Sequence, residues 1–365
     1  MIRNKGTWAL SVALFASAGS AWAQTAKAAA AAAAVNPPAQ SSAPASGTAP
    51  AKPLQLQSLD PATRADPFPK VNPSNFTAST PTVATVDSYL HAVMGFDSNR
   101  IWRVLAIQKT TAPGVTRVVA AISERTAGAK VLSAVFYVMP DGKHLIATDA
   151  QGGGVSPFGA DPYKDNRALL EARADGPSHG AAAKDLMLVE FTDLQCPHCK
   201  EAQPTMDRLA SDFPKARIVV ENFPLVNVHP YAFEAAEYGV CVAQKSNDAF
   251  FAFAKAVFDT QAGLVAGKAD ETLNAAVTKA GADPAAVAAC SKLPATKATV
   301  DAQVKLGQDL GVDQTPMLAV NGRLMPLGIP YETLRNLIAF QASLDGVSAA
   351  AESPNPTGIP SAGPK

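Results

Sequence analysis

Two cysteines separated by two residues, in Cys196-Pro197-His198-Cys199, are the side chains of this sequence best placed for chemistry. A thiolate is a nucleophile, whereas a free thiol at neutral pH is mostly protonated. The apolar run 186–191 before the motif predicts a buried strand, and apolar residues at helical spacing after it predict a helix. Helix-end N–H groups favour an anion at that position. We therefore predict that Cys196 is the exposed nucleophile and that Cys199 resolves the mixed disulfide.

The residues between the cysteines fit the same chemistry. Pro197 suits a first helical turn, where its missing N–H is not needed. His198 is expected to stabilise the Cys196 thiolate by charge or by a hydrogen bond. The alternative is half of a zinc site, which requires two further ligands. Cys241 and Cys290 are far apart in the sequence and have no histidine at metal-ligand spacing, so we predict a redox pair and no metal.

The elements that must position this pair extend over residues 183–345. Between 228 and 310 the pattern is helical, with Asp248 and Asp283-Pro284 as helix-start signals. Pro316 precedes a short apolar run, which favours a turn that enters a strand. An ordinary trans proline turn is the alternative there. These features predict an α/β domain with a helical insertion.

This part of the chain resembles the DsbA-like branch of the thioredoxin-fold oxidoreductases. Cys196-Pro197-His198-Cys199 is identical to that family's motif, and Glu190 lies six residues before the first cysteine. Phe223-Pro224-Leu225 with His229-Pro230, and Thr315-Pro316 followed by Asn321-Gly322, occur in the family's order. The resemblance implies an α/β thioredoxin-like fold with an inserted helical subdomain, preceded here by a small α+β domain.

The resemblance also implies roles for single residues. Glu190 would be a buried carboxylate that relays protons for the buried cysteine. Thr315 and Pro316 would form a cis-proline loop that faces the cysteines and binds substrate peptide. Cys241 and Cys290 fit two interpretations, buried free thiols or a structural disulfide, and the resemblance favours the disulfide.

Two features depart from DsbA. Thr315 occupies the position where DsbA has valine, and the small N-terminal domain is similar to those of the DsbC and DsbG isomerases. These departures leave the direction of electron flow open. They also suggest a homodimer formed through residues 81–152.

The rest of the chain divides by composition. Residues 1–23 have a basic start, a short apolar stretch and Ala21-Trp22-Ala23, which is typical of a cleavable signal peptide. Residues 24–80 are rich in Ala and Pro and predict a disordered tether. A helix at 83–94 and strands at 115–122, 131–139 and 144–148 predict the small α+β domain at 81–152. Residues 153–182 are expected to be a linker, and 346–365 a disordered tail.

The charge and composition of the chain exclude some classes of function. Lysine plus arginine and aspartate plus glutamate both number 31, so no basic field favours nucleic acid. We predict a periplasmic thiol:disulfide oxidoreductase without a cofactor, since its redox equivalent is the Cys196–Cys199 disulfide. Its expected partners are thiol-containing exported proteins and a membrane redox protein that renews the disulfide. The alternatives are an isomerase or reductase, a chaperone-like protein that binds clients with its N-terminal domain, and a peroxidase or glutathione-dependent enzyme.

Overall fold

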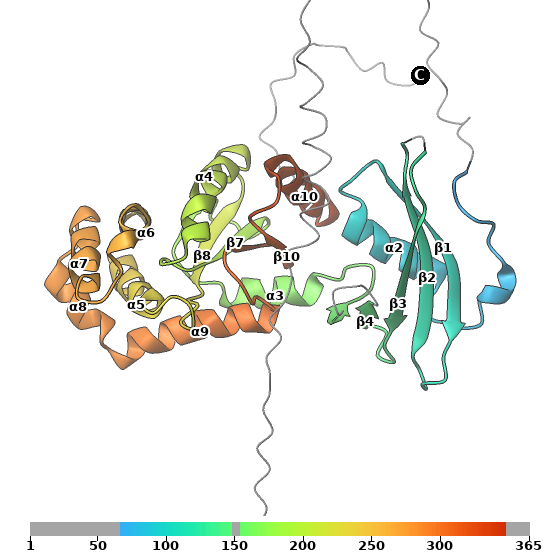
Figure 1. Ribbon diagram of the computed structural model, residues 1–365, viewed down its shortest axis with the longest axis horizontal. Helices are drawn as coiled ribbons and strands as arrows, with labels where there is room; N and C mark the ends of the chain where they lie inside the picture. Colours follow the sequence, from blue (N-terminus) through green and yellow to red (C-terminus); the bar gives the residue numbers. More distant parts are fainter. Residues whose placement is uncertain (1–65, 127, 148–153, 348–365) are drawn as a thin grey trace, which may run out of the picture.

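The computed structural model describes residues 66–126, 128–147 and 154–347. The predicted signal peptide, most of the predicted tether and nearly all of the predicted tail lie outside these residues. Figure 1 shows two domains joined through α3. Among the described residues, no helix has the length and apolar character needed to cross a membrane.

The N-terminal domain is an antiparallel sheet with one helix against it. α2 begins at Val83 because the Thr82 side chain accepts a hydrogen bond from the backbone N–H of Thr85. Val86 and Leu90 of this helix are buried against the sheet. The sheet order is β1-β2-β3-β4-β5. The elements are η2 (Pro73–Asn75), α2 (Val83–Met94), β1 (Arg100–Lys109), β2 (Thr116–Glu124), β3 (Leu132–Val138), β4 (His144–Ala147) and β5 (Val155–Pro157).

The boundaries of this domain differ from the sequence-based expectation. Part of the expected tether belongs to it, because the backbone N–H groups of Thr77 and Ala78 donate to the carbonyl of Ile107 on β1. The expected linker 153–182 is also structured: it contributes β5 to this sheet and contains α3 and β6. The strand β1 was not predicted, since its apolar and polar residues do not alternate cleanly.

The C-terminal domain is a three-layer α/β fold. Its sheet has the order β10-β9-β7-β8-β6, with β7 and β8 parallel and the other neighbours antiparallel. α4 and α10 cover one face, and α3 and α9 cover the other. The elements are α3 (Lys164–Arg173), β6 (Ser178–Gly180), β7 (Met187–Thr192), α4 (Pro197–Asp212), β8 (Arg217–Asn222), α9 (Pro294–Leu310), β9 (Met317–Val320), β10 (Arg323–Pro326) and α10 (Tyr331–Leu344).

The predicted helical insertion follows β8. It consists of α5 (Ala232–Ala243), α6 (Asn247–Asp259), η3 (Gln261–Gly263), α7 (Ala269–Lys279), α8 (Pro284–Ser291) and the start of α9. We call α5 to α8 the cap. Its core is built around Phe250 and Phe253 and includes both Cys196 and Cys199. The prediction of a thioredoxin-like α/β fold with inserted helices is confirmed.

The two domains meet at the turn of the β9–β10 hairpin. Asn321 (φ 45°) and Gly322 (φ 91°) form this tight turn. Next to it, the guanidinium of the buried Arg323 donates to the carbonyls of Ala92 (3.0 Å) and Val93 (2.5 Å), near the C-terminal end of α2. Cations are favoured at helix C-termini, so this contact fixes α2 against the second domain.

Candidate active site

Cys196 and Cys199 lie at the start of α4. Cys196 is the N-cap residue of the helix and Pro197 occupies its first turn, so Cys199 lies about one turn further along. β7 ends at Thr192 and delivers the chain to this point. The predicted order of strand, paired cysteines and helix is therefore what the structure shows.

The two thiols have opposite acidities. The pKa of Cys196 is lowered to about 5, chiefly because the Cys199 thiol donates a hydrogen bond to it, with help from the backbone N–H groups of Cys199 and His198. The pKa of Cys199 is raised, mainly by burial and then by Cys196. At neutral pH, Cys196 is a thiolate and Cys199 is a thiol.

Cys196, the predicted nucleophile, is less accessible than expected. Cys196 is only 4% exposed, and Cys199 is fully buried. The cis-proline loop explains this difference, because the carbonyl oxygen of Thr315 lies 3.8 Å from Cys196 Sγ. A cavity of about 310 Å³ lies beside this loop, and the residues that line it include His198, Thr315 and Pro316.

The peptide bond between Thr315 and Pro316 is cis. The Thr315 hydroxyl is buried and has no hydrogen-bond partner among the described residues, yet it is close enough to lower the pKa of Cys196. We interpret it as a donor that is available to the thiolate. The structure thus brings Thr315 and Pro316 to the cysteines, as the resemblance implied.

Glu190 lies on β7 beneath the cysteines. It is 3% exposed, and burial raises its pKa to about 7. The Gln203 side chain donates to Glu190 Oε1 at 3.2 Å and to the Cys199 carbonyl at 3.1 Å. A carboxyl with this pKa can hold or release a proton near neutral pH.

His198 is directed away from the predicted contact. Its Nδ1 lies 3.0 Å from Glu201 Oε2, and both side chains are exposed. Glu201, and then Cys196, raise the pKa of His198. The ring of His198 and the Cys196 sulfur therefore interact through space, while the direct hydrogen bond to Cys196 comes from the backbone N–H of His198.

Several site residues were missed by sequence reasoning. The Gln261 side chain donates to the carbonyls of Leu194 (2.9 Å) and Cys196 (3.0 Å), and the Gln195 side chain donates to the carbonyl of Leu264 (3.0 Å). These bonds attach η3 of the cap to the loop that carries Cys196. An isolated glutamine gives no sequence signal, because its role depends on the fold.

Asp193 was also missed. It is buried, and its Oδ2 accepts hydrogen bonds from the Leu225 N–H (2.8 Å) and from the His229 ring (2.8 Å). The Asp193 N–H lies 3.4 Å from Cys199 Sγ. The sequence feature that could have identified Asp193 is its position directly after a predicted buried strand and before the cysteines.

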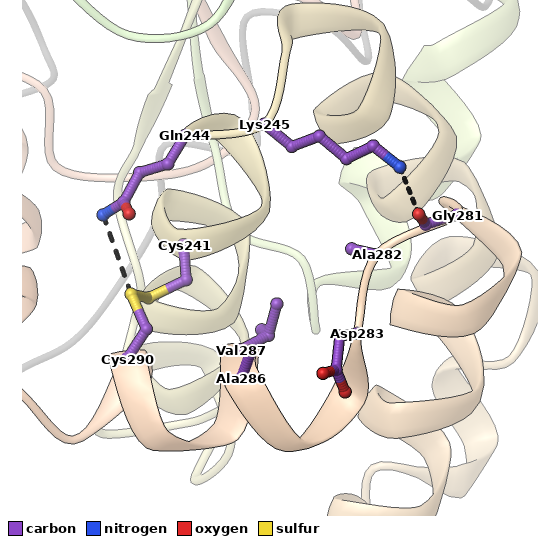
Figure 2. Close-up of a pocket in the computed structure, with 9 residues that line it drawn as sticks. All are labelled: Cys241, Gln244, Lys245, Gly281, Ala282, Asp283, Ala286, Val287 and Cys290. Carbon is purple, nitrogen blue, oxygen red and sulfur yellow. Dashed lines mark hydrogen bonds between the residues drawn. A yellow bond between two sulfur atoms is a disulfide. The ribbon is translucent and has the colours of Figure 1, made fainter.

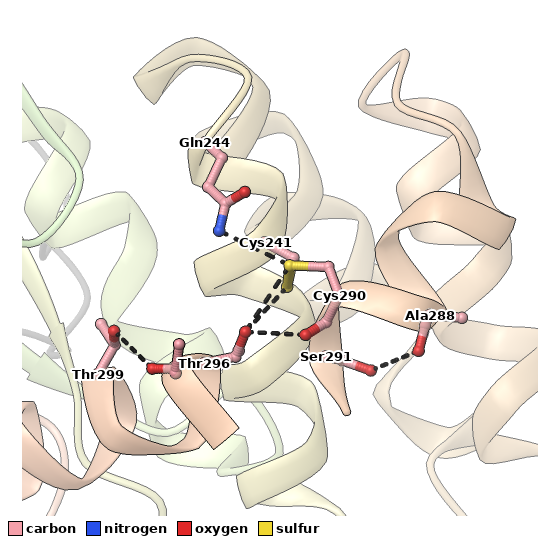
Figure 3. Close-up of a disulfide and its surroundings, with 8 residues drawn as sticks. Cys241, Gln244, Ala288, Cys290, Ser291, Thr296 and Thr299 are labelled. Carbon is pink, nitrogen blue, oxygen red and sulfur yellow. Dashed lines mark hydrogen bonds between the residues drawn. A yellow bond between two sulfur atoms is a disulfide. The ribbon is translucent and has the colours of Figure 1, made fainter. Parts of the chain in front are cut away.

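Cys241 of α5 and Cys290 of α8 are joined by a disulfide, with Sγ atoms 2.03 Å apart and Cα atoms 6.0 Å apart. Figure 3 shows the Thr296 hydroxyl beside both sulfurs, at 3.6 and 3.7 Å. This pair is separate from the reactive cysteines and braces the cap.

A pocket of about 340 Å³ lies against this disulfide (Figure 2). Lys245 closes one side by donating to the Gly281 carbonyl, and Gln244 donates to Cys290 Sγ at 3.6 Å. All residues that line this pocket belong to the cap, and neither Cys196 nor Cys199 is among them. The pocket is therefore associated with the Cys241–Cys290 disulfide and not with the Cys196–Cys199 pair.

The C-terminal domain can be compared with known protein families. Residues 174–339 match the family model described as Thioredoxin. With its inserted cap and cis-proline loop, this part of the chain has a thioredoxin-like fold.

Known structures and relatives overlap with part of the chain. A thioredoxin-like oxidoreductase from Silicibacter pomeroyi is 25% identical over 47% of this chain and 95% of its own, with a TM-score of 0.41. BdbD from Bacillus subtilis is 18% identical over 46% and 93%, with a TM-score of 0.42. A Na(+)/H(+) antiporter, NhaA 3 of Salinispora tropica, is 36% identical over 66 residues. The chain spans only 10% of that antiporter's length.

Proposed function

We propose that this chain is an exported thiol:disulfide oxidoreductase that introduces disulfide bonds into exported proteins through Cys196 and Cys199. The supporting observation is the asymmetry of the pair: Cys196 has a pKa of about 5, whereas the pKa of the buried Cys199 is raised. Such a pair has one good nucleophile and leaving group, Cys196, and one protected resolving thiol, Cys199.

The proposed reaction transfers two electrons from substrate to protein. A substrate thiolate attacks Cys196 Sγ, the Cys196–Cys199 bond breaks, and Cys199 leaves as a thiolate that takes a proton from Glu190. A second substrate thiolate then attacks the substrate sulfur, and Cys196 leaves as a thiolate. The substrate gains a disulfide, and the protein holds the Cys196 thiolate and the Cys199 thiol.

The acidity of Cys196 favours oxidation of substrates over their reduction. A pair is oxidising when its reduced form is stabilised. Relative to an ordinary thiol, which is protonated at pH 7, a pKa of about 5 stabilises the reduced form at pH 7 by about two pKa units. That is about 2.7 kcal/mol, or about 60 mV toward a more oxidising potential.

The proposed partners are thiol-containing exported proteins and a membrane redox protein that reoxidises the pair. No cofactor is required, because the disulfide carries the electrons. The proposed location is the periplasm, which follows from the signal-peptide pattern of residues 1–23. That environment allows disulfides to persist.

The activity is tested with a reduced, unfolded protein whose refolding requires disulfides. Cys196→Ser should abolish its oxidation, and Cys199→Ser should accumulate mixed disulfides. Near-normal oxidation by Cys196→Ser would contradict the assignment of the nucleophile. The reduction potential of the pair tests the direction, since a thioredoxin-like value near −270 mV would indicate a reductase or a weak isomerase.

A second candidate is an isomerase or a client-binding protein. Thr315 favours it because threonine before the loop proline resembles the isomerases DsbC and DsbG, and the separate N-terminal domain favours it for the same reason. A dimer formed through residues 81–152 would support either activity. Sedimentation of the full chain tests this, because a monomeric mass at micromolar concentration would remove the proposed self-association.

A further inference from the structure

A small cavity lies between the sheet, α4 and α6 of the cap, and Glu190 is one of the residues that line it. Its volume is about 50 Å³. About 10–15 Å³ of such volume accommodates one water molecule, so the cavity has room for about three. Its polar lining comes from different elements: His179 of β6, Glu190 and Thr192 of β7, and Gln203 and Asp207 of α4.

The inner end of the cavity has an unsatisfied polar group. Thr192 is 2% exposed, and its hydroxyl has no hydrogen-bond partner among the described residues. A buried hydroxyl without a partner is costly unless water satisfies it. This hydroxyl also lies close enough to influence both Glu190 and Cys199. A water molecule at the inner end would therefore satisfy the Thr192 hydroxyl and lie close to the Glu190 carboxyl and the Cys199 thiol.

The outer end of the cavity reaches the surface. His179 and Asp207 both line it and both are exposed. The His179 ring is held by an edge-on contact with Phe251, with ring centroids 4.7 Å apart. The charge of Asp207 acts on His179 and also on the buried Glu190. One cavity thus connects a fully buried carboxyl with an exposed imidazole.

We propose that this cavity is the proton route of the resolving cysteine, and that His179 at its mouth exchanges the proton between Glu190 and solvent through water. The inference rests on the proposed function. When Cys199 forms the disulfide, its proton passes to Glu190, and from there through water to His179 and the solvent. When Cys199 leaves as a thiolate, a proton travels the opposite way. No other reactant is required.

His179 is suited to this role by its surroundings. Burial lowers its pKa, and Asp207 partly opposes this effect, so the ring is neutral and can accept a proton at pH 7. Among the described residues, His179, Glu190 and Asp207 are the ionisable side chains that line the cavity. The remaining lining residues are apolar: Leu194, Met206, Ile218, Val220, Phe250, Phe251, Ala254 and Phe258. Because apolar side chains cannot accept a proton, proton transfer is restricted to the polar side chains and the water between them.

The test follows one step in the full-length protein. A mixed disulfide is formed between Cys196 and a chromogenic aromatic thiol. Release of that thiol by Cys199 is then measured by stopped flow as a function of pH. His179→Gln should slow release about tenfold near pH 7 and change the pH profile, and added imidazole should restore the rate. His144→Gln, at an exposed histidine of the other domain, is the control.

A second variant blocks the route without removing the histidine. Ala254→Leu places bulk in the cavity and should slow release in a way that imidazole does not restore. Ala252→Leu, on the exposed side of the same helix, should leave the rate unchanged. Wild-type rates and pH profiles in both His179→Gln and Ala254→Leu would overturn the proton route. Failure of the wild-type protein to release the thiol would instead overturn the proposed function.

Discussion

At the scale of single residues, the loop threonine is the most direct test of how the thiolate is stabilised. Thr315→Val removes a hydroxyl that lowers the pKa of Cys196. One hydrogen bond is worth about 1 kcal/mol, so we expect the pKa to rise by about half a unit to one unit. The pH dependence of Cys196 alkylation by iodoacetamide measures this. Thr299→Val, on an exposed turn of α9, is the matched control. An unchanged titration would show that the hydroxyl does not reach the thiolate.

The buried carboxyl predicts a pH-dependent stability. Burial raises the pKa of Glu190 to about 7, above the value of about 4.3 in an unfolded chain. Between these pH values the unfolded chain binds fewer protons than the folded one, so Glu190 reduces stability as pH rises from about 4.3 to about 7. Glu190→Gln should therefore raise the free energy of unfolding by roughly 1–3 kcal/mol at pH 8 and have little effect near pH 4.

Urea unfolding at both pH values measures that difference. Glu201→Gln removes an exposed carboxyl from the same domain and should change stability by well under 1 kcal/mol at either pH. A Glu190→Gln variant that is less stable than the wild type at pH 8 would contradict the interpretation.

At the scale of elements, the disulfide between α5 and α8 makes the cap one unit. It closes a loop with a sequence separation of 49 residues. The loop-entropy relation gives a loss on the order of 4 kcal/mol when both cysteines are replaced by alanine. Calorimetry of this double variant measures the loss. A melting temperature equal to that of the wild type would show that the bond does not brace the cap.

Sequence reasoning worked best where one element gave a local signal. The bounds of α2, the strand before Cys196 and the Asp283-Pro284 helix start are all observed near their expected positions. It failed where structure depends on distant partners. The polar segment 154–182 forms secondary structure because α3 packs its Leu170 into the sheet core and β6 pairs with β8. Likewise, Gln261 and Asp193 acquire roles only when the cap and the sheet meet.

At the scale of the whole molecule, a buried cation is one of the contacts that join the two domains. Arg323 is 7% exposed, and its ring neighbours are Phe96 and Tyr163. No carboxylate pairs with it in the described parts of the chain. Arg323→Met leaves the two carbonyls of α2 unpaired, which should cost about 2 kcal/mol at the interface.

This loss of interface free energy should cause the two domains to unfold at different temperatures. Calorimetry of the full-length Arg323→Met protein is expected to show two transitions where the wild type shows one. Arg335→Met, at an exposed arginine of α10, is the control. A single, unshifted transition in the Arg323→Met protein would mean that the domains do not depend on this contact.

The bonds between Gln261, Gln195 and the backbone around Cys196 have a consequence for protein engineering. A designer who grafts Cys196-Pro197-His198-Cys199 alone onto another thioredoxin scaffold would transfer the sulfurs without the clamp that sets the loop. The smallest transplantable module is discontinuous: it joins residues 193–199 to 260–264, which are far apart in the sequence. Recombination that exchanges the cap between homologues should therefore succeed only where both segments come from the same parent.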